Sequence, residues 1–366
     1  MKIQYNLNPM HERRFDSVNL TKTLGFGKLR TDHIFLMDYA NGHWSNPRIV
    51  PYQSLELAPG AMALHYGQSV FEGAKAFLHD DGEIYTFRID KNCERLNQSA
   101  KILSMPQVPL EMQQAGINAL LDVERNWMPK QENASMYIRP FMFATDDDLS
   151  VRASDSYTYA VMLSPSGSYY PNGMNKSIKL LISKTYHRAV TGGTGAAKAA
   201  GNYAASLRAQ KQAIEYGADQ VLYLDANNQY IEEVGAMNHF HITHCGKLVI
   251  PEFTDTILQS ITSQSILALS PQLESLFGVT AVQEKIPCEQ FIADIKVGKI
   301  VEAGGFGTAA VATSVGSYVL ESKHTVQVAD GNIGPLTAKL YEFYTAMQNG
   351  KIAAPENWLV KVERNS

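Results

Sequence analysis

Hydrophobic and polar positions along the first half of the chain predict strands that alternate with helices. Strand-like runs are found at 32–39, 73–79, 83–88, 135–144 and 157–163. Asn41-Gly42 and Asp80-Asp81-Gly82 are typical turn sequences at the ends of such runs. Helices are expected from about Lys91 and from about Leu110. In the second of these helices, one face is formed by Leu110, Ile117, Leu120 and Leu121.

The second half continues this mixed pattern. Strands are expected at 177–183, 220–224 and 229–233, the last two joined by a turn at 226–228. An alanine-rich helix is predicted to begin near Asn202, a good N-cap residue, and to end at Gly217. Another helix is bracketed by Pro335 and Gly350. The apolar stripe of that helix, which we assign to the core, consists of Leu336, Leu340, Phe343 and Met347.

The pattern predicts a mixed α/β (α+β) protein with two domains. At 366 residues, the chain is long enough for each domain to bury its own core. The segment 164–175, rich in Gly, Pro, Tyr and Asn, is the best candidate for a linker. We therefore expect a smaller N-terminal α/β domain with an inter-domain loop at 1–170, and a larger C-terminal domain at 171–366.

Composition narrows the classes of partner. Charged residues make up 19% of the chain and hydrophobic residues 45%, so little surface is left for a solvated tail, since about 25% charged is average. The formal net charge of −4 argues against nucleic acid or an anionic membrane as partner. Three widely spaced cysteines fit a reducing compartment. With no signal, transit or membrane-spanning pattern, the protein is expected to be soluble and cytoplasmic. We assign no metal site.

The first of three glycine-rich segments runs from Gly192 to Lys198. A nucleotide P-loop needs Gly before the lysine and Ser or Thr after it, whereas Ala197 and Ala199 hold those places. One interpretation is a turn that carries a surface lysine. The other is a lysine among small residues that reaches a buried ligand, where partial desolvation would make its amine a nucleophile.

The second segment, Gly305 to Ala310, fits the fingerprint G-x-G-x-x-A after an expected strand at 299–303. It would imply a nicotinamide oxidoreductase. However, the sequence at 311–315 favours a strand or loop over the helix that such a site needs. Its backbone amides and the Thr308 hydroxyl could also hold a phosphate or carboxylate without that fold.

The third segment, 65–77, is dense in aromatic and charged residues and could be no more than a sheet surface. Taken singly, four other residues have equally ordinary interpretations as surface or salt-bridge residues: Arg95, Tyr137, Arg139 and Glu233. Periodicity and spacing alone do not assign them a function.

Taken together and in order, these segments resemble the branched-chain amino-acid aminotransferases, which are fold-type-IV pyridoxal-phosphate enzymes. The resemblance covers nearly the whole chain and is closest to the longer form of the family. Its most specific parts are Tyr66–Phe77 (YGQSVFEGAKAF), Tyr137-Ile138-Arg139-Pro140, 198–203 (KAAGNY), 233–238 (EVGAMN) and Gly307-Thr308-Ala309.

The resemblance implies pyridoxal 5'-phosphate as cofactor. Lys198 would bind it covalently and then move a proton during catalysis. Glu233 would face the ring nitrogen and keep it protonated, and Tyr203 would bind the phenolic oxygen. The phosphate would be held by Arg95, Thr308 and the backbone amides of Ile261 and Thr262, at the start of a helix near Ser260.

The resemblance also implies the substrates: leucine, isoleucine or valine, with 2-oxoglutarate as amino acceptor. Tyr66 and the Thr308–Ala309 backbone would bind the α-carboxylate. Phe26, Tyr137 and Tyr169 would surround the aliphatic side chain. Arg139, with Tyr66 and Tyr137, would bind the second carboxylate of glutamate. Val151 would reach the pocket of a partner subunit, which implies a homodimer.

Two features depart from the family pattern. Ala236 stands where longer members often have threonine, and Ala310 and Thr313 replace a CxxC pair found in some relatives, so no thiol switch is expected. Alternatives within the fold type are D-amino-acid aminotransferase and aminodeoxychorismate lyase. Outside it, they are the nicotinamide oxidoreductase and a non-catalytic binding module.

Overall fold

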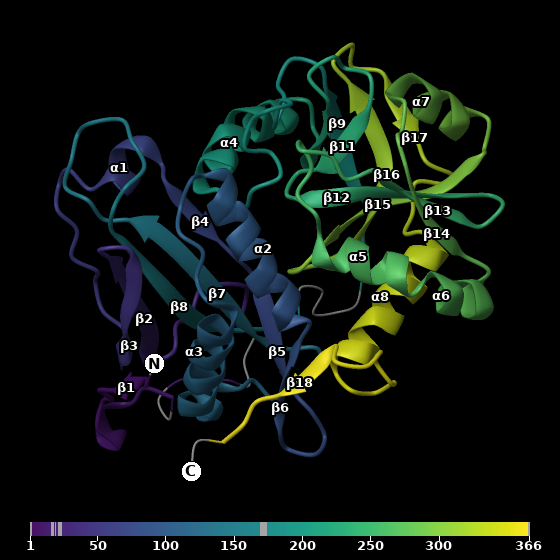
Figure 1. The fold of residues 1–366 in the computed structure, drawn as a ribbon. Coiled ribbons are helices and arrows are strands. Elements are labelled where there is room, and N and C mark those ends of the chain that lie inside the picture. The colour runs from purple at the N-terminus through teal and green to yellow at the C-terminus, as the bar shows by residue number, and fades with distance from the viewer. Residues whose placement is uncertain (1, 16–17, 19, 21–23, 169–173, 365–366) are drawn as a thin grey trace. The chain divides into compact units, whose positions relative to one another are not determined.

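The computed structural model describes residues 2–15, 18, 20, 24–168 and 174–364, and its elements are labelled in Figure 1. Two compact units are distinguished. Unit 1 comprises Met1–Pro171, Ala197–Gly201 and Ala346–Ser366, and unit 2 comprises Asn172–Ala196 and Asn202–Thr345. A single division at residue 170 therefore differs from these units in two segments, 197–201 and 346–366. Backbone hydrogen bonds explain the difference, because Phe71 N donates to Lys198 O and a C-terminal strand pairs with the strand Ile84–Phe87.

Unit 1 contains a mixed sheet with the strand order β1-β3-β2-β8-β7-β5-β6-β18, and β4 pairs with β7. The strands are β1 (Gln4–Tyr5), β2 (His33–Ala40), β3 (His43–Pro51), β4 (Ser69–Phe71), β5 (Ala74–Leu78), β6 (Ile84–Phe87), β7 (Ser135–Ala144), β8 (Tyr157–Ser166) and β18 (Leu359–Lys361). Both turns predicted from sequence occur: Asn41 and Gly42 adopt positive φ values of 53° and 80° between β2 and β3, and β5 pairs antiparallel with β6. Such φ values suit Asn and Gly in a two-residue hairpin turn.

Helices α2 (Ile89–Ile102) and α3 (Leu110–Val123) pack against this sheet, and both begin close to the predicted positions. Gly116 of α3 lies directly on Phe35 of β2: a Cβ at this glycine would be 2.7 Å from the ring. On the predicted face of α3, Ile117, Leu120 and Leu121 are buried, whereas Leu110 at its start is exposed. The shorter elements are α1 (Met62–Tyr66) and the 3-10 helices η1 (Met10–Glu12) and η2 (Arg125–Trp127).

Unit 2 contains a sheet with the order β11-β10-β9-β16-β15-β12-β13-β14, and β17 pairs with β16. An additional pairing of β11 with β12 closes six of these described strands into a ring, as in a small barrel. The strands are β9 (Ile178–Ser183), β10 (Gln220–Leu224), β11 (Ile231–Val234), β12 (Met237–Thr243), β13 (Lys247–Pro251), β14 (Thr280–Glu284), β15 (Ile300–Gly307), β16 (Val311–Leu320) and β17 (Thr325–Gln327).

Helices cover both faces of this sheet. α4 (Ala200–Glu215) packs through Ala209 and Ala213, whereas α7 (Cys288–Lys296) packs through Phe291 on the alternate strand residues. The other helices are α5 (Ile261–Ala268), α6 (Ser270–Phe277) and α8 (Pro335–Gln348). Glu302 of β15 caps α8 by accepting from the Leu336 and Thr337 amides, both at 2.8 Å.

The beginning of α4 corrects one prediction. Asn202 is not its N-cap, because the helix already starts at Ala200. The Asn202 side chain instead binds the preceding loop, accepting from Thr194 Oγ1 at 2.7 Å and donating to Thr194 O at 2.8 Å.

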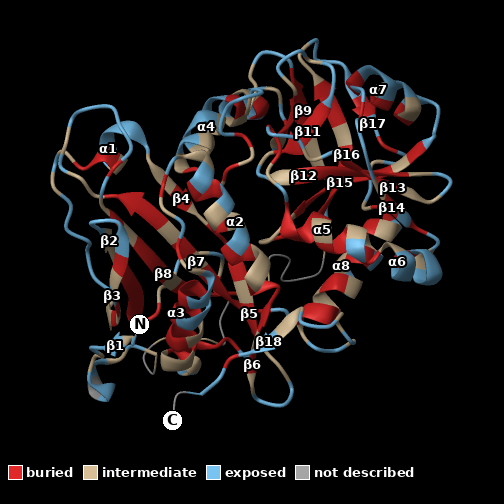
Figure 2. Cartoon of the chain, viewed as in Figure 1, coloured by how far each residue is buried: buried red, intermediate tan, exposed pale blue. Residues whose placement is uncertain are grey.

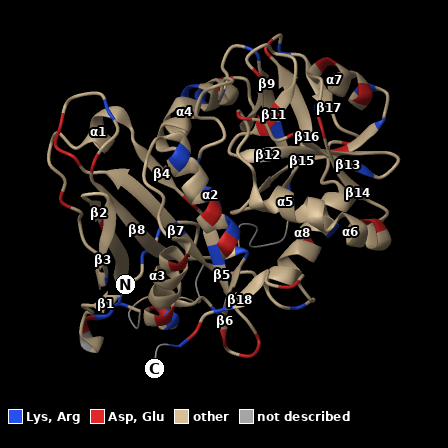
Figure 3. Ribbon diagram, in the orientation of Figure 1, with Lys and Arg blue, Asp and Glu red and all other residues tan. Residues whose placement is uncertain are grey.

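Burial and charge follow the elements. The strands are largely buried (Figure 2), and charged residues lie mainly on helices and loops (Figure 3). Pro335 begins α8 and Gly350 follows its end, as predicted, and Leu340 and Met347 of its apolar stripe are buried. Within the described ranges, no helix has the length and apolar character needed to cross a membrane.

Candidate functional site

Lys198 lies in unit 1, on the short segment that leads into α4. Its backbone is fixed at both ends, because its N–H donates to Ser99 Oγ of α2 at 2.9 Å and its carbonyl accepts from Phe71 N at 3.0 Å. Its amine nitrogen lies 4.8 Å from the centre of the Phe71 ring, a cation–π distance. The neighbours Ala197 and Ala199 are buried. The lysine is therefore held in a defined, partly desolvated position.

A buried ion pair between Glu72 and Arg95 lies near this lysine. Arg95 Nε and Nη2 donate to the two Glu72 oxygens at 2.7 and 2.9 Å, and Asn92 and the Gly73 amide bind the same carboxylate. Burial raises the pKa of Glu72, but Arg95, Lys198 and Asn92 together more than offset this, and the net pKa lies below its usual value. Glu72 thus remains ionised and fixes the plane of the Arg95 guanidinium.

Tyr137 contacts two other predicted substrate-binding residues of unit 1. Its ring packs edge-on against Phe26, with centroids 4.8 Å apart. Its hydroxyl accepts from Arg139 Nη2 at 2.9 Å. A Cβ at position 73 would be 2.1 Å from this hydroxyl, so a larger residue there would displace the Tyr137 side chain. These contacts bring Phe26, Tyr137 and Arg139 together.

Arg139 is held by aromatic rings. Its guanidinium carbon lies 4.7 Å from the Phe71 ring centre and 5.3 Å from that of Tyr137. Among the described residues it has no ion pair with a carboxylate, and its buried Nε has no hydrogen-bond partner. The salt bridge that an ordinary structural arginine would make is therefore not found in this part of the chain.

The loop that carries Val151 is rigidly built although it is exposed. Val151 and Leu149 are 85% and 69% exposed. Beside them, Arg152 binds Asp146, Asp148 and Asp155 at 3.1, 2.9 and 3.0 Å. Hydrogen bonds donated to Asp148, chiefly by the amide and hydroxyl of Ser150 and then by Arg152, lower its pKa to about 2.

Tyr66 contacts this loop, because its hydroxyl donates to Leu149 O. Tyr66 itself ends α1, where Gly67 turns the chain with a positive φ of 65°. The remaining substrate candidate of this part, Tyr169, lies outside the described residues.

Glu233 lies in unit 2, buried in the middle of β11 between β10 and β12. One of its oxygens accepts from Leu258 N at 2.9 Å, and the other is 3.1 Å from Arg188 Nε. Asn238, across the strand pair, binds Leu258 O and Ser260 N at 3.0 and 3.2 Å. Glu233 is therefore connected to the start of α5 by a short hydrogen-bond network.

The start of α5 presents backbone donors. The helix runs Ile261–Ala268, and its N-cap Ser260 accepts from Ser263 N at 3.3 Å. No hydrogen bond to a described residue is found for the amides of Ile261 and Thr262. Backbone amides at the positive end of a helix are suited to binding an anion.

Thr308 and Ala309 occupy the turn between β15 and β16. The dinucleotide interpretation of this segment is wrong, because its first glycines lie within β15 and the strand β16, not a helix, follows. Packing explains the glycines: Cβ atoms at Gly305 and Gly307 would be 3.1 and 2.9 Å from Met237 of β12. Ala310 and Thr313 also lie in this hairpin, in the turn and on β16.

Two other candidates lie elsewhere in unit 2. Tyr203 is on the first turns of α4, where its carbonyl accepts from Ser206 Oγ at 2.7 Å. Ala236 lies exposed in the tight turn between β11 and β12.

Sequence reasoning missed three supporting residues of these networks: Glu72, Arg188 and Asn238. Glu72 and Asn238 lie inside the motifs that resemble the family, but their contacts could not be predicted from the sequence. Arg188 carried no sequence signal at all, since its partner Glu233 is distant along the chain.

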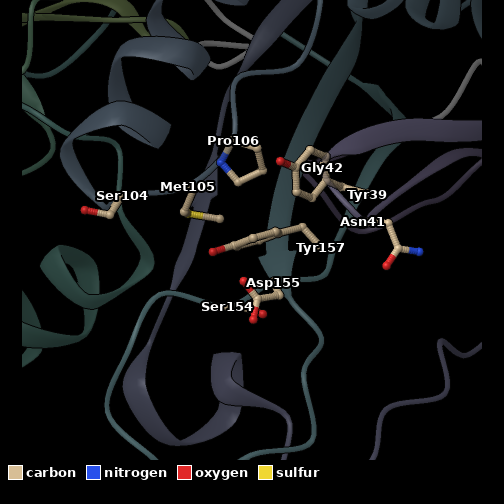
Figure 4. A pocket seen from close by; sticks show the side chains of 9 residues that line it. All are labelled: Tyr39, Asn41, Gly42, Ser104, Met105, Pro106, Ser154, Asp155 and Tyr157. Carbon is tan, nitrogen blue, oxygen red and sulfur yellow. The ribbon is translucent and has the colours of Figure 1, made fainter.

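Two other concave surfaces of unit 1 are lined by different residues. One cavity of about 630 Å³ is lined by Tyr39, Asn41, Gly42, Ser104, Met105, Pro106, Ser154, Asp155 and Tyr157 (Figure 4). Another, of about 780 Å³, lies beside residues 53–58. None of the predicted site residues lines either cavity, so neither changes the assignment of the site.

Comparison with known proteins agrees with this arrangement. The family model for amino-transferase class IV matches residues 69–297. Branched-chain-amino-acid transaminase 1 of Bacillus subtilis (strain 168) is 45% identical over 342 residues, covering 93% of this chain and 94% of that protein. A branched-chain-amino-acid aminotransferase of Mycolicibacterium smegmatis is 39% identical and covers 98% and 97%.

Among solved structures, the branched-chain amino acid aminotransferase of Escherichia coli superposes with a TM-score of 0.73 at 26% identity. It covers 91% of this chain and 99% of its own. Family model, full-length relatives and fold agree. The chain therefore belongs to the class IV aminotransferases and, within them, to the branched-chain-amino-acid aminotransferase family.

Proposed function

We propose that this aminotransferase transfers the amino group of leucine, isoleucine or valine to 2-oxoglutarate, giving branched-chain 2-oxo acids and glutamate. The observation that carries the proposal is the 45% identity to the Bacillus subtilis transaminase over 93% of the chain. D-Amino-acid aminotransferase and aminodeoxychorismate lyase remain alternative outcomes of the test. They are not favoured, because relatives that cover 93% or more of this chain carry the branched-chain name.

The cofactor of this reaction is proposed to be pyridoxal 5'-phosphate. The donor set fits it: an amine at Lys198, a buried carboxylate at Glu233, and two backbone amides at the start of α5 suited to a phosphate. A branched-chain amino acid aminotransferase of the same fold, 26% identical, was solved with pyridoxamine 5'-phosphate. When bound, the cofactor supplies an electron sink for the substrate carbon that loses its proton.

Each residue has a separate proposed part in holding the cofactor. Lys198 attaches it covalently and moves the proton. Glu233 binds the ring nitrogen and Tyr203 the phenolic oxygen. Arg95, Thr308 and the amides of Ile261 and Thr262 bind the phosphate. The bidentate contact with Glu72 supports this part for Arg95, because it leaves the guanidinium oriented but still cationic.

Substrate recognition is proposed to combine aromatic packing with one cation. Phe26, Tyr137 and Tyr169 surround the aliphatic chain, and Tyr66 with the Thr308–Ala309 backbone binds the α-carboxylate. Arg139 binds the second carboxylate of glutamate. Its contact with the Tyr137 hydroxyl supports this part, since a hydroxyl can satisfy the guanidinium when leucine is bound.

The protein is further proposed to act as a cytoplasmic homodimer in which Val151 reaches the partner subunit. The exposure of Val151 and Leu149 on a loop braced by Arg152 supports this, because two aliphatic side chains held rigidly in solvent suit an interface. Sedimentation of the purified protein tests the oligomeric state.

The activity is tested by comparing amino donors with 2-oxoglutarate as acceptor. Leucine, isoleucine and valine should be used with overlapping efficiency, because an aliphatic pocket distinguishes a methylene by only about 1–3 kcal/mol. Aspartate and D-alanine should be poor donors. A visible absorbance band on the purified protein should accompany the activity, and a preference for a D-amino acid would move the protein to the first alternative.

A further inference from the structure

Arg188 is buried beside Glu233 in unit 2, where the two side chains are only 7% and 5% exposed. Its Nε lies 3.1 Å from Glu233 Oε2, an ion-pair contact that does not have hydrogen-bond geometry. The same guanidinium donates to the carbonyl of Gly195 through Nη1 at 3.2 Å, and also to that of Thr256. Arg188 is thus a buried cation, and its contacts with the two loop carbonyls fix the orientation of its guanidinium.

We infer that Arg188 is a positioning residue that keeps Glu233 ionised and oriented, so that the proton it shares with the cofactor stays on the ring nitrogen. The inference rests on the proposed role of Glu233 and deepens it. Arg188 itself is not proposed to touch the cofactor or the substrate.

The physical reason is the competition for one proton between a carboxylate and the ring nitrogen. A buried carboxylate without a counter-charge has a raised pKa, because burial destabilises its charged form. Such a carboxylate would take the proton and leave the ring nitrogen neutral, which weakens the electron sink. A cation at 3.1 Å has the opposite effect, since it stabilises the carboxylate.

Two neighbouring ionisable side chains, Tyr223 and Glu232, do not provide this charge. Tyr223 on β10 is neutral, because burial raises its pKa to about 12. Glu232, adjacent on β11, has a pKa raised by burial and binds the Thr256 hydroxyl. Arg188, in contrast, is a cation in ion-pair contact with Glu233.

The test is a double-mutant cycle on the holoenzyme, read by titrating apo-protein with pyridoxal 5'-phosphate and by following the absorbance of the bound cofactor against pH. Arg188→Met should weaken cofactor binding about ten- to a hundred-fold, the effect of losing a charged partner. In the background of Glu233→Gln, which has no charge to stabilise, the same substitution should cost less than about threefold. Arg188→Lys keeps a cation and should restore most of the affinity and the wild-type pH titration.

Equal losses in both backgrounds would overturn the inference, because the arginine would then act through the Gly195 and Thr256 carbonyls alone. If Arg188→Met does not fold, the pH titrations of Arg188→Lys and Arg188→Gln decide. A wild-type titration in Arg188→Lys supports the inference. A titration of Arg188→Lys that is shifted as far as that of Arg188→Gln overturns it. The matched control is Glu232→Gln, buried on the same strand, which should bind the cofactor within about threefold of wild type. A wild-type protein that binds no cofactor would instead refute the proposed function itself.

Discussion

A buried arginine–glutamate pair lies in each unit, but the two pairs are arranged in opposite senses. In unit 1, Glu72 is completely buried and accepts hydrogen bonds from Arg95, Asn92 and the Gly73 amide. In unit 2, Arg188 donates to the carbonyls of Gly195 and Thr256, and Glu233 also accepts from Leu258 N. We therefore assign the supporting role to the carboxylate in the unit 1 pair and to the guanidinium in the unit 2 pair.

This difference matches the proposed ligand groups. A phosphate needs a cation, and a carboxylate behind Arg95 orients that cation. A protonated ring nitrogen needs an anion, and a guanidinium behind Glu233 stabilises that anion. A buried ion pair gives little net stability, so we interpret each pair as a means of fixing the charge and orientation of one ligand-binding group.

The largest expected effect comes from removing Lys198, the residue proposed to bind the cofactor covalently. Lys198→Ala should lose nearly all turnover, about a thousand-fold or more, together with the visible band of the covalently bound cofactor. The protein should still fold, because the backbone contacts of residue 198 with Ser99 and Phe71 do not use its side chain. Circular dichroism and steady-state kinetics measure the two properties, and normal turnover would refute the assignment.

The second prediction removes the carboxylate charge from the Glu72–Arg95 pair of unit 1. Glu72→Gln leaves the Arg95 charge buried without a counter-ion, and should lower the free energy of unfolding by about 3 kcal/mol in urea denaturation. The pKa of Glu72 lies below its ordinary value of 4.5 in the folded protein. Its contribution is therefore complete above that pH and is lost as the pH falls through the lowered pKa.

Glu94→Gln is the matched control for this prediction. Glu94 is next to Arg95 on α2 and pairs with Lys91 at 2.8 Å, but both side chains are exposed. An exposed pair contributes less than about 1 kcal/mol. Equal destabilisation by the two substitutions would show that the Glu72 pair has no special role.

Much of this framework could be predicted from the sequence because it depends on local interactions. The turn at Asn41 and Gly42 needs only residues that tolerate positive φ, and α3 needs only its apolar face. The beginning of α4 was missed because Asn202 binds Thr194 in a loop whose path is set by tertiary contacts. Likewise, Gly305 and Gly307 resemble a nucleotide fingerprint in sequence, whereas their reason is contact with Met237 on another strand.

The chemistry of the site was predictable only through the resemblance to a family. No periodicity distinguishes Glu233 from Glu232, which is adjacent and also buried. Their difference lies in their partners, since Glu233 contacts Arg188 and Leu258 N, whereas Glu232 contacts the Thr256 hydroxyl. Such contacts join residues far apart in the chain, and a single sequence does not reveal them.

The third prediction separates the two pairs by the part of the cofactor that each is proposed to serve. Arg95→Ala should weaken binding of pyridoxal 5'-phosphate roughly a hundred-fold, the effect of two charge-assisted hydrogen bonds, but should change the affinity for pyridoxal, which has no phosphate, very little. Arg188→Met should weaken both, because the ring nitrogen is common to the two molecules. Titration of the apo-proteins with each compound checks this, and equal losses for both compounds in Arg95→Ala would contradict a phosphate contact.

The last prediction concerns Arg139, which differs from Arg95 and Arg188 because no described carboxylate pairs with it. Aromatic faces and the Tyr137 hydroxyl hold its guanidinium instead. A cation without a fixed counter-ion can accept the second carboxylate of glutamate, and the hydroxyl satisfies it when an aliphatic substrate is bound. Arg139→Met should therefore slow the glutamate half-reaction about ten- to a hundred-fold and the leucine half-reaction far less. Single-turnover measurements of each half-reaction decide between the roles, since equal losses would mean that Arg139 maintains the local fold and does not bind the substrate carboxylate.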